Sequence, residues 1–394
     1  MTQIKYFSFI ALIAGISSLN PVAIDIFLPA MPAIARSMAV DPGTLGITLG
    51  IFTIGTAFGQ ITFGPISDKF GRKPVIIFGL SVYVIAAVLA SYSSNIVELS
   101  IFRFIQGIGA ASGRIIGVAI VRDLHSEERA ARLLSNIWTI STIVPIINPF
   151  IGSALINYFP WGSVFLFMAV FAGVMVLLTI FFFKETSKHK NPKALNPREL
   201  SRNFFQVSIN RIFLAYTLIG SVTMSSLYGF LATSSDLLIT QLGQSPATFA
   251  WQFALVGFGS LTGSFISARL SIKFGINRVI KLGLFITAIS SLSFLLLSLN
   301  GVFTVTAIIV PFTIQRVGEA MISAQSMAGA ISPFPRHAGA ASSLLGFFRQ
   351  LTGASIAILA GYYSDGTTLP MAITCIFAGL TPTVIYFYFR REIN

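Results

Sequence analysis

The apolar residues of this chain fall into twelve long blocks, and no other feature constrains its fold so strongly. Each block is near the ~20 residues that a helix needs to cross the hydrocarbon core of a bilayer. Because lipid offers no hydrogen bonds, spanning segments are helices or closed barrels, and continuous apolar blocks without strict alternation exclude a barrel. We therefore expect an all-α membrane protein with twelve transmembrane helices, at residues 7–31, 44–66, 75–94, 99–121, 133–156, 162–183, 211–234, 247–270, 279–299, 302–325, 339–362 and 369–389.

The basic residues are concentrated on one side of these predicted spans. The chain has 26 Lys and Arg against 13 Asp and Glu, a net charge of +13. With the N-terminus in the cytoplasm, the cytoplasmic segments and the adjoining ends of the spans hold 21 of the 26, the outer loops hold only Arg36, and four lie deep inside spans. This asymmetry follows the positive-inside rule, which places both termini in the cytoplasm. The net charge therefore reflects membrane topology and does not indicate a nucleic-acid partner.

Residues that could build a metal centre, a disulfide framework or a catalytic site are scarce. The single cysteine, Cys375, excludes a disulfide framework and a cysteine metal cluster. The sequence has no HExxH or GxSxG motif. GIGAAS (107–112) is similar to a dinucleotide-binding loop, but it lies inside a predicted span with no strand before it. We expect a protein that is not an enzyme and needs no metal or cofactor.

The two halves of the chain are similar to each other. GPISDKFGRKP (64–74) joins the second and third spans, and ARLSIKFGINR (268–278) joins the eighth and ninth; both contain K-F-G. Six-helix halves repeated in parallel are typical of transporters that bind their substrate between the halves. The expected bundles lie at residues 1–183 and 211–394, with a polar cytoplasmic linker at 184–210. For this linker we favour a simple connector over a regulatory tail.

Several of these motifs resemble those of one transporter family. GPISDKFGRKP resembles the signature loop of the major facilitator superfamily, and RFIQGIGAA (103–111) resembles its fourth-span motif. IDIFLPAMPAIA (24–35), VRD (121–123) and INPFIGS (147–153) together resemble the Bcr/CflA branch of drug–proton antiporters. The resemblance covers the whole chain. It implies the major facilitator fold, with two six-helix bundles around a central cavity.

The chain departs from the family pattern at two places. The fifth-span motif usually ends in two glycines after the proline, and here Gly152 is followed by Ser153. In the second-half loop, Ile272 stands where the first-half loop has Asp68. The first departure weakens the inference of antiport moderately, and the second means that only the first loop carries the acidic residue.

The first loop combines residue types at a spacing that predicts a specific cluster. Gly71 permits a tight reversal between two helices. Asp68 can cap a neighbouring helix end, or pair with Arg72 or Lys73. Arg132 of the next cytoplasmic loop is a further possible partner. In the family that the loop resembles, this cluster is a latch between helices that breaks on opening inward. The alternative is anchoring by basic residues, which requires neither an aspartate nor a glycine at fixed spacing.

The fourth predicted span holds two arginines. Arg103 and Arg114 are 11 residues apart, about three helical turns, so they share one helix face with Gln106. An arginine at mid-bilayer costs about 2.5 kcal/mol or more, and such residues normally line a pathway or meet a partner. We therefore place Gln106 and Arg114 on a substrate cavity. For Arg114 the alternative is a buried pair with a helix-end carbonyl.

Asp25 is the only acidic residue within the first-half spans. It lies between Pro21 and Pro29, which interrupt the helix and free backbone carbonyls. Counting helical rises puts Asp25 and Arg103 at similar depth, where an ion pair that forms and breaks would be a proton switch. The family resemblance implies the same roles, because its members use a first-span acid and the fourth-span arginine in coupling. The alternative is a static ion pair.

The fifth predicted span carries Pro145, Pro149 and Gly152. Two prolines four residues apart are expected to kink the helix and leave carbonyls unpaired. In the family that the chain resembles, this motif accompanies antiport, which implies export.

Three further charged residues lie inside the second-half spans. Arg316 and Glu319 are one turn apart in the tenth span and can pair along the helix, and Arg349 lies in the eleventh. Together with Arg114 they fall about 12–17 Å from the inner ends of their spans. Such a layer carries two more positive than negative charges, which is costly unless an anion visits it. We therefore add Arg316, Glu319 and Arg349 to the predicted substrate cavity.

The sequence thus predicts a proton-coupled secondary transporter of a bacterial inner membrane, acting as a monomer. Its partners are protons, the lipid bilayer and a small organic substrate that is exported, as in drug or metabolite efflux. An anionic metabolite such as a polycarboxylate siderophore, exported or imported, is the alternative favoured by the arginine layer. A membrane receptor that does not transport is a remote alternative, which would not need Asp25.

Overall fold

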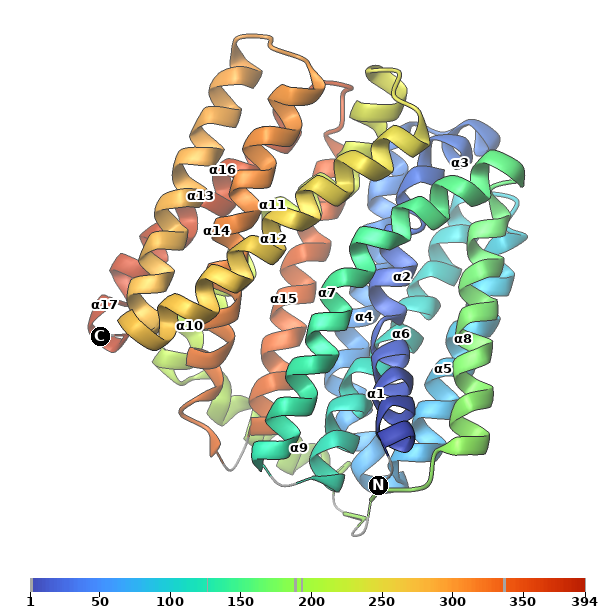
Figure 1. Cartoon of the computed structure of the whole chain (residues 1–394), viewed down its shortest axis with the longest axis vertical. Coiled ribbons are helices and arrows are strands. Elements are labelled where there is room, and N and C mark those ends of the chain that lie inside the picture. Colours follow the sequence, from blue (N-terminus) through green and yellow to red (C-terminus); the bar gives the residue numbers. More distant parts are fainter. Residues whose placement is uncertain (1–2, 126, 188–189, 193, 336–337, 394) are drawn as a thin grey trace. The chain divides into compact units, whose positions relative to one another are not determined.

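The computed structural model describes residues 3–125, 127–187, 190–192, 194–335 and 338–393, and every regular element in these ranges is a helix (Figure 1). The elements are α1 (Gln3–Ser17), α2 (Leu19–Asp25), the 3₁₀-helix η1 (Leu28–Ala30), α3 (Met31–Met38), α4 (Pro42–Phe70), α5 (Arg72–Ser91), α6 (Ile96–Leu124), α7 (Glu127–Tyr158), α8 (Gly162–Phe182), α9 (Pro197–Ser208), α10 (Arg211–Thr223), α11 (Ser225–Ser235), the π-helix η2 (Asp236–Gln241), α12 (Pro246–Phe274), α13 (Ile276–Leu299), α14 (Val305–Ile331), α15 (Ala338–Tyr362), α16 (Leu369–Tyr388) and α17 (Arg390–Ile393).

Eleven helical segments within the described residues are long and apolar enough to cross a membrane. They match eleven of the twelve predicted spans, and the prediction of an all-α membrane protein is confirmed. The remaining predicted span, at 133–156, lies in α7, where the apolar stretch Ile143–Tyr158 is shorter than the others. The first and seventh spans are the most enclosed, with 72% of their apolar windows buried, so they lie inside the protein rather than against lipid.

The first span is broken twice, and each break has a proline as its cause. A proline lacks the backbone N–H and its ring clashes with the carbonyl four residues earlier. Four residues before Pro21 is Ser17, where α1 ends, and four residues before Pro29 is Asp25, where α2 ends. The predicted interruption around Asp25 is confirmed. Asp25 is consequently the last residue of a short helix, and its side chain lies beside an irregular stretch of backbone.

Glycines let the helices next to this segment pack closely. A Cβ atom at Gly109 of α6 would lie 2.7 Å from the carbonyl oxygen of Gly79 in α5, and one at Gly113 would meet the Ile16 backbone of α1. Small residues on this face of α6 therefore allow α1 and α5 to pack closely against it. The second half repeats the arrangement, because a Cβ at Gly318 of α14 would lie 2.7 Å from the Gly283 carbonyl oxygen of α13.

By their internal contacts the residues form two compact units. The first comprises Met1–Ala30 and Ile51–Arg202, and the second comprises Met31–Gly50 and Asn203–Asn394. The segment Met31–Gly50 belongs to the second unit although it lies in the first half of the sequence. Its place there follows from Gly46 and Gly50, whose α-carbons lie against Ala232 of α11 and Ala354 of α15. The domain boundaries at 183 and 211 stay a prediction.

Candidate functional site

Asp25 lies in the first unit in a nearly closed environment, with 5% of its surface exposed. Its Oδ2 accepts a hydrogen bond of 3.3 Å from Nδ2 of Asn148, which is itself buried in α7. No ion pair joins Asp25 to Arg103, although the structure describes both side chains. The expected partner of Asp25 is therefore replaced in this structure by a neutral amide. An amide can donate to the carboxylate and, through its oxygen, can also accept from the protonated acid.

Arg103 of α6 is fully buried among aromatic rings. Its Nη1 donates to the Ala23 carbonyl oxygen and to Oε1 of Gln106, both at 2.9 Å. The guanidinium carbon lies 4.6 Å from the centroid of the Phe27 ring and 4.3 Å from that of Phe52. The bond to Ala23 places the guanidinium of Arg103 beside α2, at the residue two positions before Asp25. Cation–π attraction to the rings compensates part of the cost of burying its charge.

The predicted face shared by Arg103, Gln106 and Arg114 is divided. Gln106 is fully buried and donates through Nε2 to the sulfur of Met168 at 3.6 Å, which positions its Oε1 for Arg103. Arg114, further along α6, is exposed. The structure thus brings Arg103 and Gln106 together in one buried site near Asp25 and leaves Arg114 outside it.

The fifth-span motif packs directly on this site. Pro145 and Pro149 both lie inside the continuous helix α7, and Asn148, the partner of Asp25, lies between them. A Cβ atom at Gly152 would clash with the backbone of Ile26, the residue after Asp25. The motif therefore brings α7 against the end of α2. Asn148 was visible in the sequence as part of this motif, but nothing in the sequence placed it on Asp25.

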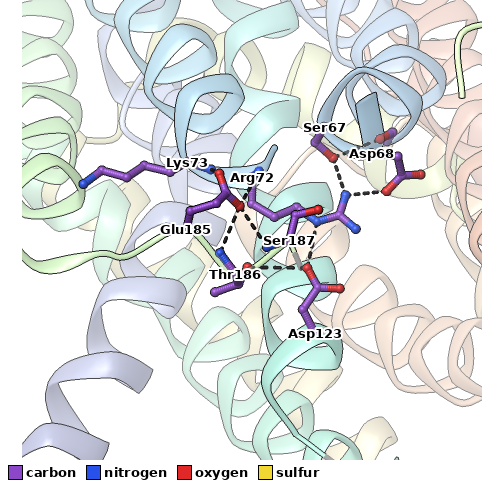
Figure 2. A network of polar contacts seen from close by, with 9 residues as sticks. Ser67, Asp68, Arg72, Lys73, Asp123, Glu185, Thr186 and Ser187 are labelled. Carbon is purple, nitrogen blue, oxygen red and sulfur yellow. Dashed lines mark hydrogen bonds and ion pairs between the residues drawn. The ribbon is translucent and has the colours of Figure 1, made fainter. Parts of the chain in front are cut away.

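A second polar site occupies the loop between α4 and α5 of the first unit (Figure 2). Arg72 lies at its centre: Nη1 pairs with Asp68 Oδ1 at 2.5 Å and Nε with Asp123 Oδ2 at 2.9 Å. Nη1 also donates to Oγ of Ser67. We call Ser67, Asp68, Arg72, Lys73, Asp123 and Glu185 the loop cluster. The predicted pairing of Asp68 with Arg72 is confirmed, whereas the side chain of Arg132, another predicted partner, lies outside the described ones.

Glu185, which follows α8, was missed by the sequence analysis and completes this cluster. Its carboxylate accepts backbone N–H groups from Arg72 at 2.9 Å and Lys73 at 3.1 Å, the first two residues of α5 (Figure 2). It also accepts from Thr186 and Ser187 of its own segment. Partial burial acts to raise the pKa of the Glu185 carboxyl, but these four donors outweigh it, and the pKa lies below its ordinary value.

Because Gly71 precedes α5, the start of that helix needs a capping group from elsewhere in the chain, and Glu185 supplies it. Gly71 is the N-cap of α5 and has no side chain to accept the free N–H groups at the helix start, so Glu185 accepts them instead. Its φ of 107° is a conformation that glycine adopts readily, and a Cβ there would lie 2.6 Å from Oε2 of Glu185. The predicted reversal at Gly71 is confirmed. The glycine also makes room for the carboxylate.

Lys73 has a different role from the predicted pairing with Asp68. Its Nζ donates to the Ile180 carbonyl oxygen at 2.8 Å, in the last turn of α8, where carbonyls lack partners within the helix. The loop cluster consequently connects one end each of α4, α5, α6 and α8, all within the first unit.

The second unit holds a buried ion pair. Arg316 Nη1 pairs with Glu319 Oε2 one turn later on α14, as the sequence predicted, and Arg316 Nε donates to Ser260 Oγ of α12 at 3.0 Å. Glu319 is 1% exposed. The positive charge of Arg316 is therefore compensated by a neighbour on its own helix.

Arg349 of α15 lies elsewhere in the second unit, against α10 and α14. Its Nη2 donates to the Ser323 carbonyl oxygen at 2.9 Å, and a Cβ atom at Gly220 would lie 2.7 Å from the same nitrogen. Nearby Ser326 and Ser221 are buried, and their hydroxyl oxygens have no hydrogen-bond partner among the described residues. The glycine thus permits the guanidinium to approach a polar patch of hydroxyl groups.

The chain is similar to known transporters over its full length. Residues 13–357 and 217–393 match the model of the Major Facilitator Superfamily. The chain is 29% identical to the Bicyclomycin resistance protein homolog of Haemophilus influenzae over 100% of its length and 98% of that protein. It is 34% identical to the Multidrug resistance protein MdtL of Salmonella dublin, over 86% of this chain and 84% of the relative.

Its fold also matches a solved structure, a bacterial homolog of the human lysosomal transporter Spinster. The TM-score is 0.78 at 15% identity, and the match covers 100% of this chain and 98% of the other. Motifs, fold and relatives agree, and the resemblance to the Bcr/CflA branch is confirmed by the relatives. The chain belongs to the major facilitator superfamily and is a multi-pass membrane transporter, not an enzyme.

Proposed function

We propose that this protein exports small organic molecules in exchange for protons, in the manner that the names of its drug-resistance relatives indicate. The two units act as the halves of one monomer in a bacterial inner membrane, with both termini in the cytoplasm. The relatives named for bicyclomycin and multidrug resistance support a drug-like substrate. No residue in the sequence distinguishes antiport from symport, so the direction rests on these relatives and on the fifth-span motif.

Asp25 is the proposed proton-binding carboxylate, and its surroundings are the observation that carries the proposal. It is buried, lies at a helix break, and has a neutral hydrogen-bond partner in Asn148 that suits both of its protonation states. Arg103 binds the carbonyl oxygen of Ala23, two residues before Asp25, and forms no ion pair with Asp25. Protonation of Asp25 would therefore require no ion pair to break, and the fixed charge of Arg103 would favour the carboxylate when the proton leaves.

We expect Asp25→Asn to abolish proton-driven transport while the protein stays folded. The measurement is uptake of a cationic dye and of bicyclomycin into proteoliposomes under an imposed pH gradient, together with the melting temperature of the purified variant. Asp41→Asn, at an exposed acid between α3 and α4, is the matched control and should transport normally. Wild-type coupling in Asp25→Asn would rule out this carboxylate as the coupling site.

Transport of an anionic metabolite is the second candidate, and the surroundings of Arg349 favour it. Its guanidinium lies at a patch of buried hydroxyl groups, which can donate to a carboxylate alongside the arginine. Arg316 supports an anion less well than expected, because Glu319 already compensates it.

If the cargo is anionic, Arg349→Ala should weaken its binding by about 1.5–3 kcal/mol, the scale of hydrogen bonds to a charged group. Binding of a carboxylate-rich siderophore, its neutral ester and a cationic dye should be compared in wild type, Arg349→Ala and Arg114→Ala. Tight binding of the dye that neither substitution changes would dismiss the anion and leave drug efflux.

A further inference from the structure

Two neighbouring side chains of α14 each leave one buried oxygen atom without a hydrogen-bond donor. Glu319 is 1% exposed and Gln315 is fully buried. In both, Oε1 has no partner among the residues that the structure describes. Buried acceptors in proteins are nearly always satisfied, and an unsatisfied oxygen of a charged group is especially costly. Two such oxygens on one helix suggest that a single hydrogen-bond donor serves both of them.

The orientation of Gln315 is fixed by its other contact. Its amide nitrogen Nε2 donates to the Cys375 carbonyl oxygen of α16 at 3.2 Å. A carbonyl oxygen can only accept, so the nitrogen and oxygen of this amide cannot be exchanged. Oε1 of Gln315 is consequently an acceptor, as is Oε1 of Glu319, whose second oxygen is paired with Arg316.

The spacing of the two residues along α14 suits one donor that serves both oxygens. Positions four apart on a helix lie on the same face as direct neighbours. A proton bound to Oε1 of Glu319 would turn that acceptor into a donor, for which Gln315 Oε1 is the acceptor one turn away. One proton would then satisfy both oxygens, with no new side chain required.

The charged and titratable groups around Glu319 are few. Arg316 pairs with it from the same helix and is held by Ser260 of α12. From α16, Cys375 contacts Gln315 through its carbonyl oxygen, and its thiol is buried. From α15, Arg349 donates to the Ser323 carbonyl, one turn beyond Glu319. On α13, Thr287 packs against Gly318, and Lys281 lies over the Tyr386 ring.

We propose that Glu319 is a second proton-binding carboxylate of this transporter, built into the second unit, and that its protonation releases Arg316 from the ion pair. Neutral Glu319 would donate to Gln315, and Arg316 would keep its bond to Ser260 with its charge free to meet an anionic group. Only the statement that this proton takes part in coupling rests on the proposed function. Proton binding by Glu319 is a property of the protein alone.

The test is an infrared titration of the full-length protein in lipid without substrate. The Asp25→Asn variant removes the carboxyl group of the other proposed site. In that background the spectrum of Asp25→Asn minus that of Asp25→Asn with Glu319→Gln should contain a carboxylic-acid C=O band that grows as the pH falls, because the other acidic residues cancel in the difference. Arg316→Gln should move half-protonation to higher pH by about 1–3 units, because the neighbouring cation no longer favours the carboxylate. Gln315→Leu should move it to lower pH, because the protonated acid loses its acceptor.

Three outcomes would overturn the proposal. They are the absence of a C=O band from this difference spectrum, a difference band that does not change with pH, or half-protonation that neither Arg316→Gln nor Gln315→Leu moves. A water molecule that donates to both oxygens while Glu319 stays ionised would give the first outcome. Because the titration uses no substrate, a titrating Glu319 in a protein that fails to transport drugs would reject the proposed function and leave this inference intact.

Discussion

The two loops that join α4 to α5 and α12 to α13 have the same K-F-G turn and different surroundings. Gly71 and Gly275 both have positive φ, 107° and 78°, and each separates two long helices. Around Gly71 lie the ion pairs of Arg72 and the carboxylate of Glu185, whereas a Cβ at Gly275 would meet nothing within 4 Å. Ile272, at the place of Asp68, is 90% exposed. The repeated sequence therefore preserves the turn, and within the described part of the chain ion pairs surround the first copy and not the second.

This difference teaches that the turn and the network are separable. A glycine with positive φ is sufficient to reverse the chain between two spans, as the second loop shows. The extra residues of the first loop connect four helix ends, which a turn alone does not require. We therefore assign the reversal to the glycines of both loops and propose that conformational switching depends on the loop cluster.

Among the substitutions that test this difference between the loops, replacing Arg72 should change stability and turnover the most. Arg72→Gln leaves Asp68 and Asp123 next to each other without a cation, which should destabilise the protein by about 2 kcal/mol. We expect no larger loss, because the Asp68 side chain is 48% exposed and solvent screens its charge. We also expect slower turnover with little change in substrate affinity. Melting temperature and transport rate are the measurements.

Arg278→Gln is the matched control in the second loop. Arg278 is exposed and lies three residues after Gly275, so its loss should change stability by less than about 0.5 kcal/mol. Equal effects of the two substitutions would mean that the network of the first loop contributes nothing specific. A large affinity loss in Arg72→Gln at unchanged turnover would place the loop at the substrate instead.

The second prediction compares the two glycines. Alanine at a positive φ is strained, so Gly275→Ala should cost about 1 kcal/mol. Gly71→Ala should cost more, because its Cβ would lie 2.6 Å from the Glu185 carboxylate and displace it from α5. In a Glu185→Ala background the excess at position 71 should disappear. The measurements are the melting temperatures of the two glycine variants and of Gly71→Ala combined with Glu185→Ala. If Gly71→Ala still costs more than Gly275→Ala without Glu185, the extra cost comes from backbone strain at Gly71.

The smallest expected effect is the pH dependence of Glu185. Because its pKa is lower in the folded protein than in the unfolded chain, its contribution to stability is full above the unfolded value of about 4.3 and is lost as the pH falls through the lower folded value. Glu185→Gln should lose about 1 kcal/mol at neutral pH. The melting temperatures of wild type and variant should converge in acid.

Glu199→Gln, at an acid in the first turn of α9, is the control substitution for this experiment. A constant difference between wild type and Glu185→Gln at every pH would mean that shape, not charge, matters at this position.

Local patterns in the sequence were sufficient for much of this structure. Apolar blocks predicted eleven of the spans, prolines predicted the breaks beside Asp25, and K-F-G predicted both turns. Arg316 with Glu319, and Asp68 with Arg72, were predictable because residues three or four apart on a helix are neighbours.

Contacts between distant segments could not be found in the same way. Counting helical rises placed Asp25 and Arg103 at one depth, but depth does not fix rotation about the helix axis, and Arg103 instead contacts the Ala23 carbonyl and Gln106. Arg103 and Arg114 share a face by spacing, yet one is buried and the other exposed, because different helices pack along α6. Glu185 carried only one signal: it is the first acid after the sixth span, in a segment otherwise rich in lysine.

The bond between Glu185 and the start of α5 also imposes an order on synthesis. The two partners are 113 residues apart, so the ribosome completes α5, α6, α7 and α8 before the cap of α5 exists. At about 5–20 residues per second, α5 waits roughly 6–23 s with its first N–H groups open to water. Arg72 can join the ends of α4, α5 and α6 earlier through Asp68 and Asp123, so the cap of α5 is the last part of the loop cluster to form.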